Sequence, residues 1–358
     1  MNKNSKIYIA GHTGLVGSAL CRRLIAEGYS NLIVRDHSDL NLTRQKNVET
    51  FFQSEKPEYV FLAAAKVGGI LANYTYPAEF IYANIAIQNN VIHSAWKAGI
   101  KQLLFLGSSC IYPKECPQPM RENYLLTGPL EPTNEPYAVA KISGIKMCQA
   151  YNRQYNTQYL CVMPTNLYGP NDNFDLEKSH VLPALIRKFH LAKLAQQRDW
   201  EGIKKDEQTY GRIPDDVKAS IGIETAFPDN RKVTTDPHPL VLLWGSGNPR
   251  REFLHVDDLA DACVFLSRLE ESTFLKFFYT KHVPLINIGC GADQTIKEIA
   301  SIVSETVGFK GPVKWDQSKP DGTFQKLLDI SKIKKLGWKP NIDLKNGIRR
   351  VYEWYLKD

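Results

Sequence analysis

Two residues four positions apart could carry acid–base chemistry from one face of a helix. Tyr137 and Lys141 form a Y-x-x-x-K pattern within PYAVAK, and side chains at this spacing lie on the same helical face. A lysine ammonium close to a phenol favours the phenolate and lowers the pKa of the phenol. We therefore predict that Tyr137 donates a proton to a carbonyl oxygen that receives a hydride. The alternative is an ordinary surface pair, because this short pattern often occurs by chance.

Ser108 lies at the end of a predicted strand over 103–109, where its hydroxyl could bind the same carbonyl oxygen. Residues two apart in an extended segment point to the same side, so Cys110 is predicted to lie beside Ser108. Taken alone, Cys110 is more typical of a small core residue. His180, after the loop YGPNDNFDLEKS, is by itself more typical of a polar surface residue.

A glycine-rich turn follows the first predicted strand, KIYIA at 6–10. Gly11, Gly14 and Gly17 form G-x-x-G-x-x-G before a predicted helix over 15–28. Glycine permits a tight turn here and lets the backbone approach a pyrophosphate at the N-terminus of the helix. The pattern predicts a dinucleotide site rather than an ordinary turn, because a strand precedes it and a helix follows.

The end of the second predicted strand, LIVR at 32–35, bears on the choice of cofactor. An acidic residue here accepts hydrogen bonds from the ribose of NAD, whereas a cation favours the 2′-phosphate of NADP. Asp36 offers the first, and Arg35 and His37 offer the second. We predict NADP(H), with Asp39 and Leu40 beside the adenine. Three small residues end the third strand where the cofactor must pass: Ala63, Ala64 and Ala65.

The elements that position these residues alternate through the first half of the chain. Strands predicted at 59–65, 103–109 and 159–164 are separated by helical stretches near 78–98 and 137–155. This alternation predicts an α/β fold with a doubly wound parallel sheet. We expect a dinucleotide-binding domain over 1–165 and a smaller α/β part over 166–358 that mainly binds substrate, with an insertion at about 193–238 and some segments that return to the first domain.

The second half is less regular. Strands are predicted at 240–247 and 285–291, and helices near 257–270, 295–307 and 344–356. Residues 193–238 are rich in charge and end in Pro, Asp and Asn, which is typical of a surface insertion of helix and loop. Its expected role is surface decoration, with a lid or an oligomer contact as unsupported alternatives.

Composition narrows the class of partner. The chain has 358 residues, 43% of them hydrophobic, and a net charge of +7. Basic residues do not alternate with aromatic residues in runs, so we expect no nucleic-acid partner. No apolar stretch is long enough to span a bilayer, so we expect no membrane partner. Seven cysteines without a C-x-x-C pair, and an N-terminus without a signal-type apolar segment, predict reduced thiols and a cytoplasmic protein. We predict no metal site.

Long blocks of this sequence closely resemble the GDP-L-fucose synthases, which are GDP-4-keto-6-deoxy-D-mannose 3,5-epimerase-4-reductases of the extended short-chain dehydrogenase/reductase type. The resemblance covers nearly the whole chain outside 193–238. The blocks that carry it are LAAAKVGGI (62–70), NYTYPAEFIYAN (73–84), GSSCIYPK (107–114), EPTNEPYAVAK (131–141), MPTNLYGPNDNF (163–174), SHVLPALIRKF (179–189) and WGSGNPRREFLHVDD (244–258).

The resemblance implies a Rossmann-type fold and a role for each matching residue. Tyr137, Lys141 and Ser108 would carry out the reduction. Cys110 and His180 would be the base and the acid of epimerisation. The implied substrate-binding residues are Asn166, Val181, Lys188, Trp244 and Arg251. With the glycine turn, the predicted NADP(H)-binding set is Gly11, Thr13, Gly14, Leu15, Val16, Gly17, Arg35, His37, Asp39, Leu40, Ala63, Ala64, Ala65, Leu106, Gly107, Ser108, Tyr137, Lys141, Pro164, Thr165, Asn166, Leu167 and His180.

The implied chemistry is coherent. The C3 and C5 hydrogens of a 4-keto sugar are α to the carbonyl, so a Cys110 thiolate could remove each of them while His180 delivers a proton to the opposite face. Some family members have arginine at the positions of Thr13 and His37, which leaves Arg35 as the nearest cation. The resemblance also implies a homodimer formed through a helix pair that includes 137–155.

Two alternatives remain from the sequence. The first is a C4 reductase, with or without epimerase activity, acting on a related GDP-4-keto-6-deoxy sugar such as a heptose of surface polysaccharides. The second is a non-catalytic nucleotide-sugar-binding regulator on the same fold. The intact Tyr137 and Lys141 argue against the regulator.

Overall fold

The computed structural model describes residues 1–224, 232–233, 239–279 and 283–357. The chain divides into two compact units, each assembled from separate segments. Unit 1 comprises Met1–Asn171, Glu252–Ala292 and Leu327–Ile342. Unit 2 comprises Asp172–Arg251, Asp293–Lys326 and Asp343–Asp358. The sequence-based division at residue 165 stays a proposal.

Unit 1 is built on a six-stranded sheet in the order β12-β5-β4-β3-β1-β2, and each pairing in it is parallel. The strands are β1 (Ile7–Ala10), β2 (Leu32–Ile33), β3 (Tyr59–Leu62), β4 (Gln102–Leu106), β5 (Gln158–Pro164) and β12 (Leu285–Ile288). Parallel strands covered on both faces read as continuous apolar runs, and β1 and β12 are buried throughout. The predicted doubly wound sheet is confirmed.

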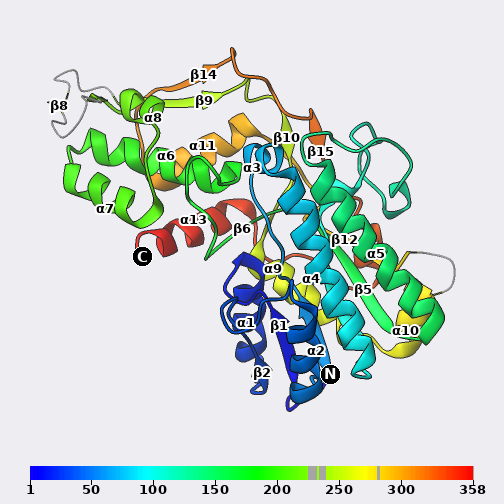
Figure 1. Ribbon diagram of the computed structural model, residues 1–358. Helices are drawn as coiled ribbons and strands as arrows, with labels where there is room; N and C mark the ends of the chain where they lie inside the picture. The colour runs from blue at the N-terminus through cyan, green and yellow to red at the C-terminus, as the bar shows by residue number, and fades with distance from the viewer. Residues whose placement is uncertain (225–231, 234–238, 280–282, 358) are drawn as a thin grey trace. The chain divides into compact units, whose positions relative to one another are not determined.

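Helices cover both faces of this sheet (Figure 1). They are α1 (Leu15–Ala26), α2 (Gln45–Glu55), α3 (Ile70–Thr75), α4 (Pro77–Lys97), α5 (Glu135–Tyr155), α9 (Val256–Leu266), α10 (Glu271–Phe274) and α12 (Ser331–Lys335). The strand order reverses at β1, so right-handed crossovers place α1 on the opposite face from α2, α4 and α5. Contacts agree, because α4 packs against α2 and α5, whereas α1 packs against α9.

Unit 1 is completed by shorter elements. The strands β6 (Asn166–Tyr168) and β11 (Phe253–His255) form a separate parallel pair, with Asn166 opposite Phe253. Short helical turns occur at Ser109–Ile111, Glu122–Tyr124 and Leu275–Tyr279. The strands predicted over 59–65 and 103–109 end earlier, at Leu62 and Leu106. The chain leaves the sheet there and forms the loops that carry the alanines and Ser108.

Unit 2 packs helices α6 (Val181–Gln196), α11 (Ile296–Val307) and α13 (Leu344–Tyr355) against one another. The described residues of this unit also form three small sheets. One pairs β9 (Val241–Trp244) with β14 (Val313–Asp316), a second contains β10 (Arg250–Arg251), β13 (Gln294–Thr295) and β15 (Gln325–Lys326), and the third pairs β7 (Ile223–Glu224) with β8 (Lys232–Val233). Helix α11 begins with a capping box between Thr295 and Glu298, which satisfies two otherwise unpaired backbone N–H groups.

Residues 193–238 are more than surface decoration, which corrects the sequence-based expectation. The segment contains α7 (Trp200–Tyr210), α8 (Asp215–Ser220), β7 (Ile223–Glu224) and β8 (Lys232–Val233), while 225–231 and 234–238 lie outside the described residues. Asp206 on α7 accepts a hydrogen bond from Arg187 Nε at 2.8 Å, and the Arg187 side chain is fully buried. Tyr355 also donates to Asp206. The charged residues of this segment therefore include a buried ion pair that joins α6, α7 and α13.

Candidate active site

The glycine turn joins β1 to α1 in a conformation that requires glycine. Gly11 has φ +85°, and a Cβ there would lie 2.8 Å from the backbone of Ala64. A Cβ on Gly17 would lie 2.0 Å from the Gly11 carbonyl oxygen. Gly14 caps α1 without a side-chain hydrogen bond, and a Cβ there would meet only the Gly11 oxygen, at 3.6 Å. The backbone N–H groups at the N-terminus of α1 are thus accessible near Gly14. A helix N-terminus of this kind can bind the diphosphate of a dinucleotide.

Most of the predicted cofactor-binding residues follow the carboxyl ends of parallel strands, where ligands of doubly wound sheets bind. Ala63, Ala64 and Ala65 follow β3, and Gly107 and Ser108 follow β4. Pro164 ends β5, and Thr165 and Asn166 follow it. Thr165 Oγ1 and Asn166 Nδ2 both donate to the Glu252 carbonyl oxygen, at 3.2 and 2.8 Å. These contacts fix the loop at the end of β5.

The structure does not bring the guanidinium of Arg35 to this edge of the sheet. Its guanidinium donates to Glu55 Oε1 at 2.5 Å and lies over the ring of Phe51, with 5.8 Å between Cζ and the ring centroid. Asp36 and His37 are exposed, and His12 Nε2 lies 3.6 Å from Asp36 Oδ1. The cation from which we predicted a preference for NADP is thus bound to a carboxylate of its own chain.

Tyr137 and Lys141 lie in the first turns of α5, as the spacing predicted. Lys141 is buried, donates from Nζ to the Leu106 carbonyl oxygen at 2.8 Å, and lies 5.6 Å from the centroid of the Tyr137 ring. Burial lowers the pKa of Lys141 to about 8. Burial, followed by the nearby Cys110, raises the pKa of Tyr137. Our expectation that Lys141 lowers the pKa of Tyr137 is therefore wrong for this structure, because the ammonium binds a main-chain oxygen and desolvation dominates.

Ser108 and Cys110 follow β4 in a different geometry from the one we expected. Residues 109–111 form a 3-10 turn rather than an extended segment, and Ser108 Oγ caps it by accepting from the Cys110 N–H at 3.4 Å. Cys110 is buried, at 7% exposure. Its charge would influence the pKa of both Tyr137 and Lys141, so the thiol lies close to the acid–base pair.

The remaining predicted residues belong to unit 2. His180 precedes α6 as its N-cap residue, and its side chain is exposed, although partial desolvation still lowers its pKa. Val181 is exposed, and Lys188 Nζ donates to the Leu242 carbonyl oxygen at 3.3 Å. Trp244 ends β9 with 60% of its surface exposed, below Lys319 Nζ at 5.4 Å. Arg251 donates to the Thr323 carbonyl oxygen at 2.6 Å.

Sequence reasoning missed three residues that support these groups. Phe105 lies under Lys141, with Nζ 4.8 Å from its ring centroid. Glu252 is fully buried and accepts from the Gly291 and Leu328 N–H groups at 2.6 and 3.0 Å. Asp321 accepts hydrogen bonds from the N–H and the hydroxyl of Ser246, one at each carboxylate oxygen, and these hydrogen bonds lower the pKa of Asp321. Of these three residues, only Asp321 lies in a sequence pattern that predicts local structure, because the pair Asp321-Gly322 is typical of a turn.

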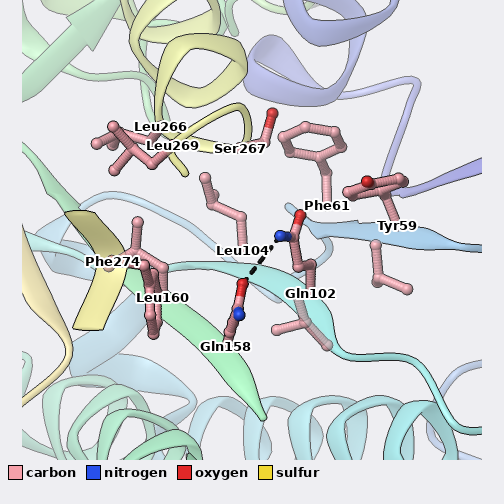
Figure 2. A pocket seen from close by; sticks show the side chains of 12 residues that line it. Tyr59, Phe61, Gln102, Leu104, Gln158, Leu160, Leu266, Ser267, Leu269 and Phe274 are labelled. Atoms are coloured by element: carbon pink, nitrogen blue, oxygen red, sulfur yellow. Dashed lines mark hydrogen bonds between the residues drawn. The ribbon is translucent and has the colours of Figure 1, made fainter. Parts of the chain in front are cut away.

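A separate shallow hollow lies at the opposite edge of the sheet (Figure 2). Residues at or near the beginnings of β3, β4 and β5 line it, together with Leu266 and Phe274. Gln102 Nε2 donates to Gln158 Oε1 at 2.9 Å on its floor. This apolar hollow is not the predicted site, because it lies at the amino ends of the strands. Among the described residues, no three or more His, Cys, Asp or Glu side chains cluster to hold a metal ion.

Comparison with known proteins places the chain. The model of the NAD dependent epimerase/dehydratase family matches residues 7–205 and 230–274. GDP-L-fucose synthase 1 of Arabidopsis thaliana is 51% identical over 357 residues, covering 100% of this chain and 95% of the relative. GDP-L-fucose synthase of Escherichia coli K12 is 47% identical, covering 99% of this chain and 97% of the relative. Both matches run through residues 193–238, which we had expected to lie outside the resemblance.

A solved structure agrees with these matches. A GDP-D-glycero-L-gluco-heptose synthase from Campylobacter jejuni, determined in the presence of NADPH, is 41% identical and has a TM-score of 0.88, with 99% of each chain covered. The chain therefore belongs to the NAD dependent epimerase/dehydratase family and, within it, to the GDP-L-fucose synthases. The resemblance recognised in the sequence is confirmed. No helix within the described part of the chain is long and apolar enough to cross a membrane.

Proposed function

We propose that this chain is a GDP-L-fucose synthase: it epimerises GDP-4-keto-6-deoxy-D-mannose at C3 and C5 and then reduces C4 with NADPH. The observation that carries the proposal is the Tyr137–Lys141 pair on α5 beside Ser108 and Cys110, in a chain half identical to GDP-L-fucose synthases along its whole length. Bound NADPH supplies the hydride for the reduction. The chain's own residues bind the sugar nucleotide and move its protons.

Ser108 and Tyr137 act on the C4 oxygen. Their hydroxyls stabilise negative charge on that oxygen when a proton leaves C3 or C5. Tyr137 then gives its proton to the oxygen during reduction, because a raised pKa keeps the phenol protonated at neutral pH. Lys141 holds its place through Leu106 and keeps a positive charge beside the Tyr137 ring.

Cys110 is the proposed base and His180 the proposed acid of the two epimerisations. A thiolate at Cys110 is favoured by the Lys141 ammonium nearby. His180 lies at the start of α6, on a segment of unit 2 that also presents Val181 and Lys188. Together with Asn166, Trp244 and Arg251, these residues would bind the GDP-sugar, with the cations facing its diphosphate.

NADP(H) is the proposed cofactor, bound across the carboxyl edge of the unit 1 sheet. Support comes from the open N-terminus of α1 at Gly14 and from the small residues that follow β3. The related heptose synthase was determined in the presence of NADPH. We also propose that the enzyme is cytoplasmic.

A homodimer is proposed through α4 and α5. These helices pack together, and each exposes a large apolar side chain, Tyr82 on α4 at 70% and Val139 on α5 at 39%. Such exposed side chains are available for contact with a second subunit. Sedimentation analysis should give a dimer for the wild type and a monomer for Tyr82→Glu, and a monomeric wild type would contradict this assignment.

The second candidate is reduction of a GDP-linked keto-heptose, the class of sugar in the name of the Campylobacter jejuni neighbour. The discriminating experiment offers the enzyme and NADPH equal amounts of GDP-4-keto-6-deoxymannose and a GDP-4-keto-6-deoxyheptose. We expect kcat/KM to favour the hexose, with GDP-L-fucose as the product. A preference for the heptose of more than about tenfold, which is a transition-state difference of about 1.4 kcal/mol, would replace the proposed substrate.

A further inference from the structure

Arg35 is the cation nearest to the predicted 2′-phosphate position in the sequence, and its surroundings bear on how strongly the enzyme prefers NADPH. Glu55, the last residue of α2, binds two cations of unit 1 at once. Arg35 donates to Glu55 Oε1 at 2.5 Å, and Lys6 Nζ lies 3.0 Å from Glu55 Oε2. These two contacts lower the pKa of Glu55, with Lys6 making the larger contribution. The carboxylate is therefore charged at neutral pH and holds both cations.

The position of this cluster matters because the sheet has two functionally different edges. Lys6 comes directly before β1, and Glu55 lies between the end of α2 and the start of β3, so both belong to the amino edge. A dinucleotide binds at the carboxyl edge, beyond Ala10. At about 3.3 Å per residue, Lys6 and Ala10 are separated by roughly 13 Å along the strand.

The backbone of Arg35 lies near the carboxyl edge of the sheet, whereas its guanidinium lies further toward the amino edge. The register pairs Ile7 with Leu32 and Tyr8 with Ile33, so its continuation brings Arg35 level with Ala10. The guanidinium nevertheless lies over Phe51, whose ring contacts Tyr8 at 4.6 Å between centroids. The side chain is thus turned back along the sheet, away from the adenosine side.

The groups left at the carboxyl edge include exposed carboxylates. Asp36 directly follows Arg35, and Asp39 lies three residues further along. A carboxylate there accepts hydrogen bonds from a ribose but repels a phosphate. With Arg35 turned away, this edge suits the ribose of NADH nearly as well as the phosphate of NADPH.

We propose that Glu55 is a specificity-determining residue that limits the preference for NADPH by holding Arg35 at the amino edge of the sheet. The inference rests on the proposed function, since it assumes a nicotinamide dinucleotide at the glycine turn. Neutralising Glu55 would leave Lys6 and Arg35 as neighbouring like charges. Arg35 would then turn toward the carboxyl edge, where a 2′-phosphate offers a charged partner.

The test is direct measurement of the dissociation constants of NADPH and NADH by protein fluorescence, without any sugar substrate. In Glu55→Gln, the Kd for NADPH should fall about two- to fivefold, the range of an exposed ion pair, while the Kd for NADH stays constant. Arg35→Gln alone should change the NADPH:NADH ratio less than about twofold. The double variant Glu55→Gln/Arg35→Gln should lose the gain.

The matched control is Glu49→Gln, one turn and a half earlier on α2, where Glu49 binds Lys97 at 3.2 Å. The side chain of Glu49 is about as exposed as that of Glu55, at 27% against 25%. This variant therefore shows how loss of an ion pair on α2 affects cofactor binding in general. We expect no change in the ratio of the Kd values for NADPH and NADH. A tenfold loss of NADPH affinity in Arg35→Gln, or an unchanged ratio in Glu55→Gln, would overturn the inference while leaving the proposed function intact. Failure of the wild type to bind either dinucleotide would overturn both.

Discussion

The Lys141 ammonium lies over the ring of Tyr137, with Nζ 5.6 Å from the ring centroid. The hydrogen bond that fixes Nζ goes instead to the Leu106 carbonyl oxygen, at 2.8 Å. Phe105 supports the ammonium from below at 4.8 Å, a distance at which a cation and an aromatic face attract. The end of β4 therefore positions the lysine of α5, and the same strand end leads into Ser108 and Cys110.

Removal of the Tyr137 hydroxyl should abolish most of the reduction. Tyr137→Phe keeps the ring but removes the proton donor, and loss of a general acid typically costs about a hundredfold to ten-thousandfold in rate. Stopped-flow oxidation of NADPH with the keto sugar measures the effect. A variant that reduces the sugar at the wild-type rate would show that Tyr137 is not the acid.

The pKa of Lys141 predicts an alkaline limit for reduction. Burial lowers this pKa to about 8, compared with about 10.4 for an unperturbed lysine, so the ammonium is lost as pH rises through about 8. Between these two pH values the unfolded chain binds more protons than the folded one. The contribution of Lys141 to the free energy of unfolding therefore rises with pH, whereas any activity that needs the Lys141 ammonium falls. We expect kcat/KM for reduction to decline with a midpoint near pH 8.

The variant Lys141→Arg separates this charge from other titrations. Arginine keeps its charge at every accessible pH, so the decline near pH 8 should move upward even if the rate is lower. The same midpoint in wild type and variant would assign the titration to another group.

Replacement of Cys110 should separate epimerisation from reduction. Cys110→Ser is nearly isosteric, but its hydroxyl is a far weaker base than a thiolate near neutral pH. Solvent deuterium should therefore enter C3 and C5 of the keto sugar much more slowly, while Tyr137 still protonates the C4 oxygen during reduction. His180 variants should exchange at least one position without completing inversion. Exchange at the wild-type rate in Cys110→Ser would leave Cys110 as a packed core thiol.

The buried ion pair of unit 2 predicts a large and local effect on stability. Asp206→Ala leaves the Arg187 charge buried without its partner, which typically costs about 3–5 kcal/mol. The control is Glu353→Ala, which removes an exposed pair with Arg349 at 2.9 Å and should cost less than about 1 kcal/mol. Urea unfolding monitored by fluorescence compares the two, and equal losses would contradict the structural role assigned to residues 200–210.

The regular part of the fold could be read from the sequence because its patterns are local. The apolar runs of β1, β3, β4 and β5 alternate with helices of sufficient length, which is the signal of parallel crossover units. Strand ends were less certain: β3 ends at Leu62 rather than 65, because small alanines fit a strand and the loop after it equally well. For the same reason, the four-residue spacing of Tyr137 and Lys141 was sufficient to place both residues on one helix.

The features that the sequence does not predict depend on burial or on partners far away in the chain. One is the pairing of Arg35 with Glu55, 20 residues later. The charged stretch containing Asp206 reads as surface until Arg187 and Tyr355 are folded against it. The pKa of Tyr137 depends on burial, and the four-residue spacing of Tyr137 and Lys141 gives no information about burial.

One NMR experiment tests whether this single chain performs both epimerisation and reduction. The wild-type enzyme is incubated with GDP-4-keto-6-deoxymannose and NADPH in deuterated water, and the product is examined by proton NMR. We expect GDP-L-fucose carrying deuterium at C3 and C5, because both positions lose a proton and regain one from solvent before hydride reaches C4. A reduced GDP-sugar that is not inverted and carries no deuterium at C3 or C5 would contradict it.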